Sequence, residues 1–380
     1  MWVLKCAADS ALGDPRLVTL NGFAGRQTWE WVPGAGTPEL RAEAARLRAA
    51  YQASRDTNKH SADELLRLQM RSEAEAKGWT SPDLDASDLP THGAPSPNHV
   101  ARSLHAGMSF YTTLLQSDGH FAGDYGGPMF LMPGMLISLY VTQTLDQVLG
   151  APAKREMVRY LENHQNPDGG FGLHIEGHST QFGTCLNYVA LRLLGKSPDA
   201  PDMTKARNWI HERGGAVTCT SWGKFWLSLL GCYSWEGQNP MPPEMWCLPY
   251  SAYTGIGWLH PGRFWCHCRM VYLPMSYLYG KRAVGPVTQL VHDLREELYP
   301  FPYHSIDWNA ARNACAKEDL YYPHPWVQDM LWWGLYKIGE PLLNGPLHFV
   351  RKAACAEVMK HVHYEDENTR YIDIGPVNKV

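Results

Sequence analysis

A short segment near the middle of the chain combines side chains that often bind metals. Trp265-Cys266-His267-Cys268 offers two thiols and an imidazole, which are common zinc ligands. The spacing fits a structural zinc site poorly, because such sites use cysteine pairs separated by two to four residues together with a second pair elsewhere. The alternative is a core histidine beside buried, unreactive thiols. The segment alone does not decide between these two interpretations.

Other kinds of active site find little support in the sequence. Nine cysteines and 17 histidines allow a Cys–His nucleophile, but such a pair forms in space and nothing in the sequence selects one. The motifs G-x-S-x-G, H-E-x-x-H, the Walker A loop and G-x-G-x-x-G are absent, which argues against the common hydrolase, zinc-protease and nucleotide-binding classes. The acidic run at residues 365–367 is typical of a solvated turn.

Aromatic content is the unusual feature of the composition. The 380 residues include 15 Trp, 19 Tyr and 10 Phe. These side chains combine a large apolar area with an electron-rich face, so they suit either a large core or a cavity that holds apolar or cationic guests. The formal net charge is −4 and there is no long basic run, so we expect no nucleic-acid partner.

The odd number of cysteines and the N-terminal sequence predict reduced thiols in a protein that faces the cytosol. Residues 1–15 lack the uninterrupted apolar core of a signal peptide. The most apolar stretch, Met129–Val141, contains Pro133 and Gly134 and is shorter than the ~18–20 residues of a spanning helix. We therefore expect no transmembrane helix, while attachment to one leaflet stays open.

The elements that must position these residues are mostly helices. Thr37-Pro38-Glu39 predicts a helix start, with a Thr cap, Pro at the first position and an acidic first turn. Gly25–Trp31 alternates like a strand, and Lys77–Pro97 has the composition of a linker. Helices are expected at residues 38–50, 61–76, 100–116, 135–149, 153–164, 183–194, 203–212, 222–230, 266–279, 286–298, 326–338 and 348–362. This pattern predicts an all-α toroid of helical hairpins.

A weak internal repeat supports a toroid of similar units. Gln116–Phe121 and Gln165–Phe171 each place Gln, then Asp-Gly, then Phe, about fifty residues apart and where a helix is expected to end. The Gln side chain could bond to carbonyls left unsatisfied at a helix end while the ring packs over it. Two ordinary Asp-Gly turns are the alternative, and the spacing leaves it open.

Several longer strings closely resemble the oxidosqualene cyclase family, and its plant and algal branch most of all. In chain order they are GRQTWEW (25–31), SDGHFAGDYGGPMFLMPG (117–134), NPDGGFGLHIEGHSTQFGT (166–184), SWGKFWLSLLG (221–231), WCHCRMVYLPMSYLYGKR (265–282), ELYPFPYHSIDWNAARN (297–313), AKEDLYYPHPWVQD (316–329) and HYEDENTRYIDIGPVNKV (363–380). The resemblance implies α/α barrels of the terpene cyclase type, with a large apolar cavity between two of them. We expect residues 1–97 to form an extended and helical segment with a linker, 98–345 the complete first barrel and 346–380 the beginning of the second.

The resemblance also implies roles for individual residues in the cyclisation of 2,3-oxidosqualene. In that reaction an acid protonates the epoxide, and aromatic faces stabilise the carbocation that migrates through the folded polyene. By motif position, the residues expected to bind substrate or cation are Trp222, Trp265, His267, Tyr125 and Val377. Cys268 and Tyr272 match the constriction between the substrate channel and the cavity. The resemblance implies no metal and no cofactor.

The Gln and Asp-Gly turns resemble the QW motifs of that family, with Phe121 and Phe171 where the family usually has Trp. Because Phe lacks the indole N–H donor, we expect weaker stapling between repeats at these two turns.

His267 also bears on the product that the resemblance implies. Cycloartenol and lanosterol synthases carry His at this position, whereas amyrin and lupeol synthases tend to carry Tyr. The resemblance therefore favours a sterol precursor, cycloartenol first, from an enzyme of the intramolecular transferase class. An apolar channel mouth would place Leu273–Gly280 at a one-leaflet attachment surface, and a buried helix is the alternative. The expected location is monotopic, on the cytosolic face of the endoplasmic reticulum or on a lipid droplet.

The proton donor of the family is the Asp of an Asp-Cys-Thr-Ala-Glu motif, which is absent from these 380 residues. A neighbouring carboxylate is no substitute, because the acid needs a pKa raised by a defined apolar site. Two hypotheses follow. In the first, the chain is the N-terminal half of a longer cycloartenol-type synthase and is inactive alone. In the second, it is a non-catalytic half that binds squalenoid lipid, a membrane or a partner half.

Overall fold

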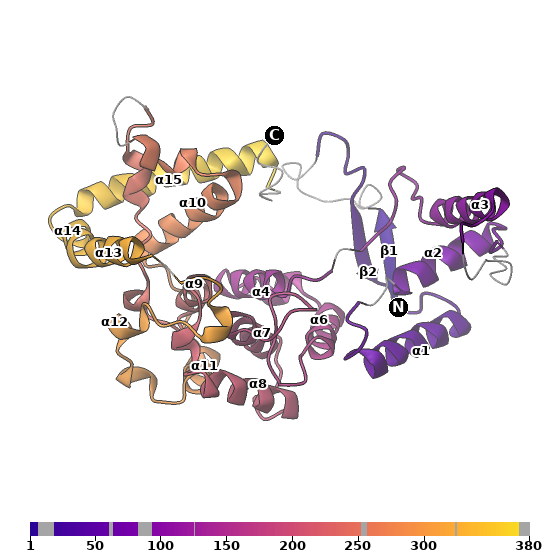
Figure 1. The fold of residues 1–380 in the computed structure, drawn as a ribbon, viewed down its shortest axis with the longest axis horizontal. Helices are drawn as coiled ribbons and strands as arrows, with labels where there is room; N and C mark the ends of the chain where they lie inside the picture. Colours follow the sequence, from indigo (N-terminus) through magenta and orange to yellow (C-terminus); the bar gives the residue numbers. More distant parts are fainter. Residues whose placement is uncertain are drawn as a thin grey trace. The chain divides into compact units, whose positions relative to one another are not determined.

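The computed structural model describes residues 1–6, 19–60, 64–82, 93–124, 126–251, 257–323 and 325–371, apart from the side chains of Trp258 and His267. Within these residues helices predominate, and the only sheet is a pair of short strands (Figure 1). The all-α class predicted from the sequence is therefore confirmed. None of the helices in this described part is both long and apolar enough to cross a membrane.

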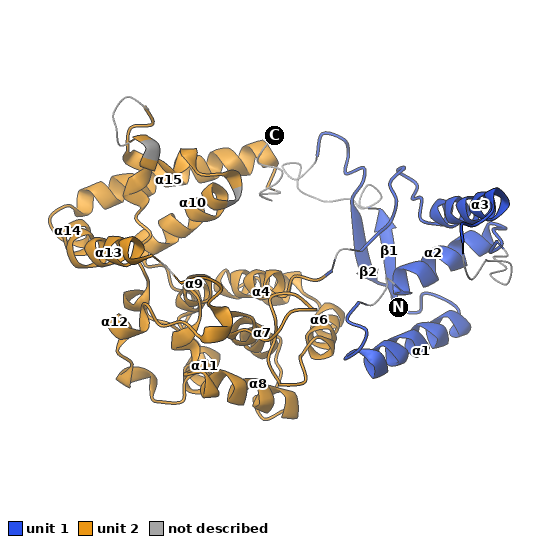
Figure 2. Cartoon of the chain, viewed as in Figure 1, with its two compact units in different colours: residues 1–126 blue, residues 127–380 orange. Residues whose placement is uncertain are grey.

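The chain divides into two compact units, residues 1–126 and residues 127–380 (Figure 2). The elements of unit 1 are β1 (Trp2–Cys6), β2 (Gln27–Trp31), α1 (Pro38–Ser54), α2 (Glu64–Ala76) and α3 (Pro97–Thr113). The α-helices of unit 2 are α4 (Leu131–Val141), α5 (Leu145–Val148), α6 (Ala151–Asn163), α7 (Gln181–Leu193), α8 (Pro201–Glu212), α9 (Ser221–Leu230), α10 (Cys266–Lys281), α11 (Gln289–Glu297), α12 (Trp308–Ala311), α13 (Trp326–Gly334), α14 (Glu340–Asn344) and α15 (His348–Thr369). The predicted domain limits after residues 97 and 345 stay predictions.

Unit 1 is organised around the antiparallel pair β1 and β2, in which Leu4 lies opposite Trp29. Gln69 of α2 binds this edge, since its side chain accepts the N–H of Leu4 at 2.8 Å and donates to the carbonyl of Leu4 at 3.1 Å. Leu4 also packs in a small core with Leu66 and Met70 of α2. The pairing confirms the extended conformation predicted for the segment that contains Trp29.

The start of α1 also follows the prediction. The Thr37 side chain accepts the N–H of Leu40, and Pro38 occupies the first helical position. A hydroxyl that accepts an otherwise unpaired N–H and a Pro that has none are the features that define a helix start.

α7 forms the centre of the first helix group in unit 2. It contacts α4, α6, α8 and α9, and all of its residues are buried except Arg192. Small and apolar residues occur on every side of α7, which is the pattern of a fully buried helix. Arg192 reaches α11 instead, where its guanidinium lies 2.9 Å from the carboxylate of Glu297.

α15 forms the centre of the second group, in which α10 packs along it. Arg351 of α15 is buried between two carboxylates, at 2.7 Å from Glu244 and 2.9 Å from Glu340. Glu340 also pairs with Arg282 at the end of α10, at 2.6 Å. These contacts hold α10, α14 and α15 together through paired charges, the form in which buried charges are tolerated.

One side of the apolar segment of α10 is buried, as the alternative interpretation of that segment expects. Leu273, Ser276 and Tyr279 are almost inaccessible, with Leu273 against Val358 of α15. Pro274 lies on the exposed side. Only that exposed side is therefore available for contact with lipid.

The two Asp-Gly segments share one backbone turn. Asp118 accepts the N–H of His120, and Asp168 accepts the N–H of Gly170, so each carboxylate closes an Asx turn. The glycine after each Asp has a φ near +88°, which favours Gly. The repeat in the sequence therefore corresponds to a backbone turn that recurs after fifty residues.

Beyond the backbone, the two turns differ. Phe171 is fully buried, whereas Phe121 is 56% exposed. The Gln165 side chain donates to the carbonyl of Asp202 in α8 at 2.9 Å, so it does connect two repeats. The indole N–H of Trp209, also in α8, donates to Asp168 at 3.0 Å. At the second turn, α8 therefore supplies the indole donor that Phe171 lacks.

Candidate functional site

The N-termini of three helices meet at one apolar pocket in unit 2. Phe130, Thr180 and Thr220 are the N-cap residues of α4, α7 and α9, and all three line it. The pocket encloses about 210 Å³, and its lining residues are Phe130, Leu173, Thr180, Phe182, Thr220, Trp222, Asp319 and Tyr321. That volume is below the ~300–1,000 Å³ of complete small-molecule sites. It therefore suits part of a large apolar ligand.

Trp222, one of the predicted cavity residues, forms a wall of this pocket. It lies in the first turn of α9, and 49% of its surface is exposed. The rest of α9 is anchored, because Phe225 and Leu229 belong to one buried cluster with Trp235 and with Tyr279 of α10. α9 ends at Gly231 in the left-handed conformation, with φ of 87°, as glycine C-caps do. The helix thus fixes Trp222 at the pocket with about half of its surface accessible.

Asp319 is the charged member of the pocket, and sequence reasoning missed it. Its carboxylate accepts the N–H of Gln181 at 2.6 Å and the N–H of Phe182 at 2.8 Å, so it caps the first turn of α7. Burial raises its pKa above the ordinary 3.8, although the two N–H bonds act in the opposite direction. Nothing local could have revealed it, because its partners are 137 and 138 residues away.

Three other predicted residues lie on the first two turns of α10. Trp265 is its N-cap residue and is 65% exposed, and its indole N–H donates to the sulfur of Cys268. Tyr272 donates its hydroxyl to the carbonyl of Pro242 at 2.8 Å, and burial raises its pKa. The structure therefore brings Trp265 and Cys268 together, with Tyr272 one turn further along. None of the three is among the residues that line the pocket of Trp222.

The remaining predicted residues cannot be placed in the same way. Tyr125 and Val377 lie outside the described residues, and so does the side chain of His267. Their expected roles, and the metal interpretation of Cys266–Cys268, stay predictions.

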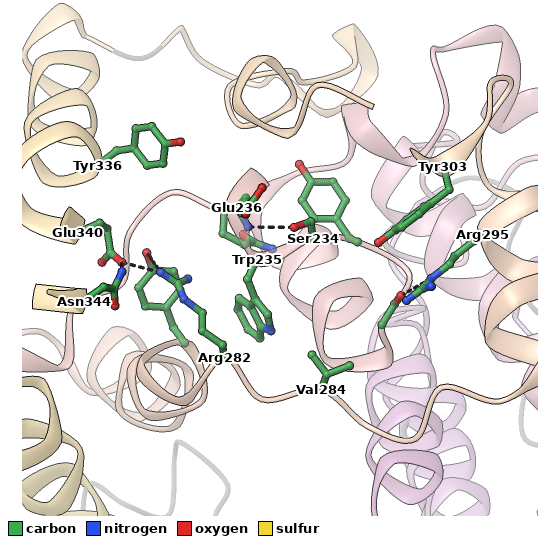
Figure 3. A pocket seen from close by; sticks show the side chains of 14 residues that line it. Ser234, Trp235, Glu236, Arg282, Val284, Arg295, Tyr303, Tyr336, Glu340 and Asn344 are labelled. Atoms are coloured by element: carbon green, nitrogen blue, oxygen red, sulfur yellow. Dashed lines mark hydrogen bonds and ion pairs between the residues drawn. The ribbon is translucent and has the colours of Figure 1, made fainter. Parts of the chain in front are cut away.

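A second pocket in unit 2 is larger, at about 550 Å³, and much more polar (Figure 3). Arg282 and Glu340 pair on one side of it, and Arg295 bonds the carbonyl of Gly231 on the other at 2.8 Å. Its lining residues are Gly231, Tyr233, Ser234, Trp235, Glu236, Gln238, Tyr279, Arg282, Val284, Arg295, Tyr303, Tyr336, Glu340 and Asn344. Charged walls suit a hydrocarbon poorly. The apolar pocket of Trp222 is therefore the better candidate for a ligand of that kind.

Known proteins resemble this chain over most of its length. Residues 107–373 match the family described as the squalene-hopene cyclase N-terminal domain. The alpha-onocerin synthase LCD of Lycopodium clavatum is 42% identical over 391 residues, which cover 100% of this chain and 49% of that protein. The cycloartenol synthase of Dictyostelium discoideum is 47% identical over 287 residues, covering 73% of this chain and 38% of that protein. The lanosterol synthase of Homo sapiens is 48% identical over 277 residues, covering 72% and 36%. The chain spans about half the length, or less, of these relatives.

Proposed function

Because the chain belongs to the family of squalene-hopene and oxidosqualene cyclases, we propose that it forms one wall of a cavity in which a longer enzyme cyclises 2,3-oxidosqualene. Its relatives are triterpene cyclases, an intramolecular transferase class. The observation that carries the proposal is the apolar pocket at the N-termini of α4, α7 and α9, with Trp222 in its wall. An apolar pocket with exposed aromatic faces suits a folded polyene and the cation that runs through it.

Two electrostatic features of the pocket act on a cation in opposite directions. A helix N-terminus carries about half a positive charge, so three of them at one pocket would oppose a nearby carbocation. Asp319 counters part of this field, since its carboxyl lies on the first turn of α7. The rings of Trp222 and Tyr321 add electron-rich surface, and both oxygens of the one carboxylate in the lining, Asp319, already accept backbone N–H groups.

The catalytic acid is proposed to come from another segment of the longer enzyme. The Asp-Cys-Thr-Ala-Glu motif is absent from this sequence. Asp319 is a poor replacement, because both of its oxygens accept backbone N–H groups of α7 and hold the carboxyl in place. We expect this chain alone to bind substrate without cyclising it.

Cycloartenol is the proposed product, supported by His267 at a position where the resemblance favours sterol precursors. The names of the relatives include onocerin, cycloartenol and lanosterol synthases, so the product must be measured. We also propose attachment to one leaflet of the endoplasmic reticulum or to a lipid droplet, supported by the apolar sequence of Leu273–Gly280.

The test exchanges the matching N-terminal segment of the Dictyostelium cycloartenol synthase for this chain. The chimaera is incubated with 2,3-oxidosqualene, and the products are identified by gas chromatography and mass spectrometry. We expect cycloartenol from the chimaera and no tetracycle from this chain alone. A desolvated aromatic face contributes about 2 kcal/mol to a cation, so Trp222→Leu should slow cyclisation about 30-fold.

Trp31→Leu is the matched control, because Trp31 is an exposed Trp that does not line the pocket. Equal losses in the two variants would remove the case for Trp222. A folded chimaera that binds oxidosqualene without converting it would favour the second hypothesis, a non-catalytic half that binds squalenoid lipid. A tetracycle made by this chain alone would show that it contains its own acid.

A further inference from the structure

Three potential metal ligands from distant parts of the chain meet in unit 1. Cys6 is the last residue of β1, and Asp118 and His120 lie in the turn that follows α3. One ligand atom from each residue lies within 4.8 Å of the others. The cluster is shielded, with Cys6 buried and the side chains of Asp118 and His120 exposed by only 9% and 15%.

The backbone holds all three residues in place. Cys6 is fixed by the strand pairing, in which it lies opposite Gln27. Asp118 accepts the N–H of His120 at 3.3 Å through one oxygen and the N–H of Gly25 at 3.0 Å through the other. These bonds tie the turn both to itself and to the segment before β2. The three side chains therefore share one preorganised corner.

The histidine faces the carboxylate of Asp118 directly. Its Nδ1 lies 2.5 Å from a carboxylate oxygen of Asp118, while its Nε2 is buried without any hydrogen-bond partner. The two ring nitrogens point in opposite directions, so an ion shared with Asp118 binds at Nδ1, where it replaces the proton between the ring and the carboxylate. Nε2 then carries the ring proton.

We propose that Cys6, Asp118 and His120 bind a divalent metal ion, with Zn²⁺ as the best match. Zinc accepts a thiolate, an imidazole and a carboxylate at about 2.0–2.3 Å, and it favours four ligands. Asp118 can accept N–H groups and still offer a lone pair, because an ionised carboxylate has about four acceptor sites. The Gln116 side-chain oxygen, 3.9 Å from the sulfur of Cys6, is close enough to complete the set.

The ion would act as a cross-link in unit 1, and the site is independent of the proposed cyclisation. Cys6 lies more than 110 residues from Asp118 and His120 in the sequence. Bond lengths near 2 Å require the ligand atoms to close in by about 1 Å, which side-chain rotation can provide. Binding to the folded state alone then stabilises unit 1.

The test uses the full chain, purified through a tag without histidines. Metal content is measured by mass spectrometry, and Co²⁺ is then added to the metal-free protein. We expect an equimolar amount of zinc and, with Co²⁺, a thiolate-to-cobalt charge-transfer band. Cys6→Ser should abolish the band, while Cys247→Ser, at an exposed cysteine, should keep it.

A second variant keeps the proposal falsifiable if Cys6→Ser folds poorly. Zinc should raise the Tm of the wild-type chain by several degrees and leave the Tm of His120→Gln unchanged. Circular dichroism checks that each protein is folded. A folded wild-type chain that retains no zinc and shows no thiolate band would overturn the site, as would a band of equal strength in Cys6→Ser.

Discussion

At the scale of residues, α9 carries two neighbours with different tasks. Trp222 lines the apolar pocket, and Lys224, two positions later, is 3% exposed. The Lys224 ammonium donates to the backbone carbonyls of Ala311, Arg312 and Ala314 at 2.7, 3.0 and 2.8 Å. All three of its donors are thereby used. Lys224 therefore fixes the first turn of α9, in which Trp222 lies.

Lys224→Met should destabilise the protein and loosen this turn. Met keeps the apolar stem but leaves three buried carbonyl oxygens without their donor, which should lower the free energy of unfolding by about 2–4 kcal/mol. Urea unfolding measures the loss. The control is Lys352→Met, because Lys352 is exposed on α15. A loss of the same size at Lys352 would contradict the role given to Lys224.

Lys224 also predicts a direction of pH dependence. Burial lowers its pKa from 10.5 to about 8. Between these two values the unfolded chain binds more protons than the folded one, so the stability contributed by Lys224 rises with pH and is lost as the pH falls through about 8. Thermal unfolding is measured at a series of pH values. The Tm of the wild type relative to that of Lys224→Met should increase as the pH rises above 8. A constant difference between the two proteins would be inconsistent with this pKa.

At the scale of elements, the two Asp-Gly turns show what a repeat in the sequence does and does not fix. The backbone turn is the same at Asp118 and Asp168. The partners of the following Phe are not, because Phe171 is enclosed and Phe121 faces solvent. In addition, Trp209 already donates to Asp168. We expected a weaker connection between repeats at Phe171, because Phe has no indole N–H. The indole N–H of Trp209 in α8 supplies a hydrogen bond at this turn instead.

Restoring the Trp of the repeat should consequently fail to stabilise the second turn. Phe171→Trp enlarges a fully buried side chain and should cost about 1–3 kcal/mol of unfolding free energy. Phe121→Trp makes the same change at an exposed position and should stay within about 0.5 kcal/mol of the wild type. Urea unfolding compares the two variants. A gain in stability for Phe171→Trp would mean that the indole contributes more than the space it needs.

Most helices could be predicted from periodicity and start signals, and the exceptions have local causes. The helix expected at residues 135–149 is two helices, broken where Gln143 adopts a φ of 59° and the hydroxyls of Thr142 and Thr144 bond to each other at 2.9 Å. The apolar pattern continues through residues 142–144, so the pattern could not reveal the break. Pro133 does not interrupt α4, because it lies in the first turn, where its missing N–H has no partner to lose.

At the scale of the whole molecule, the sequence could suggest a candidate site residue only where a motif marks it. Trp222 was expected in a cavity wall through the resemblance of SWGKFWLSLLG, and it lines an apolar pocket. Asp319 could not be found in this way, because its role comes from two N–H groups of a distant helix. The acceptors of Lys224 are likewise 87 to 90 residues away. Tertiary polar contacts of this kind leave no local pattern.

The surface of unit 2 carries an apolar face that a soluble protein would be expected to cover. On α13, Trp326 and Met330 are 70% and 61% exposed, and Val327, Leu331 and Trp333 are more than half exposed. Contiguous apolar surface of this kind marks an interaction site or a tendency to aggregate. In the proposed enzyme, another segment of the cyclase covers it. We therefore expect this chain alone to self-associate and to bind an apolar dye such as ANS.

The double variant Trp326→Glu with Met330→Lys should reverse this behaviour. It replaces two apolar side chains with an i,i+4 pair whose order also favours the helix, and it leaves the net charge unchanged. The matched control, Thr204→Glu with Asn208→Lys, introduces the same pair on α8, away from the apolar face. Sedimentation velocity should show the first variant closer to a monomer, with weaker ANS fluorescence, and the control unchanged. A wild-type chain that sediments as a monomer and does not enhance ANS fluorescence would show that the exposed face of α13 needs no cover. That result would weaken the case for a partner segment.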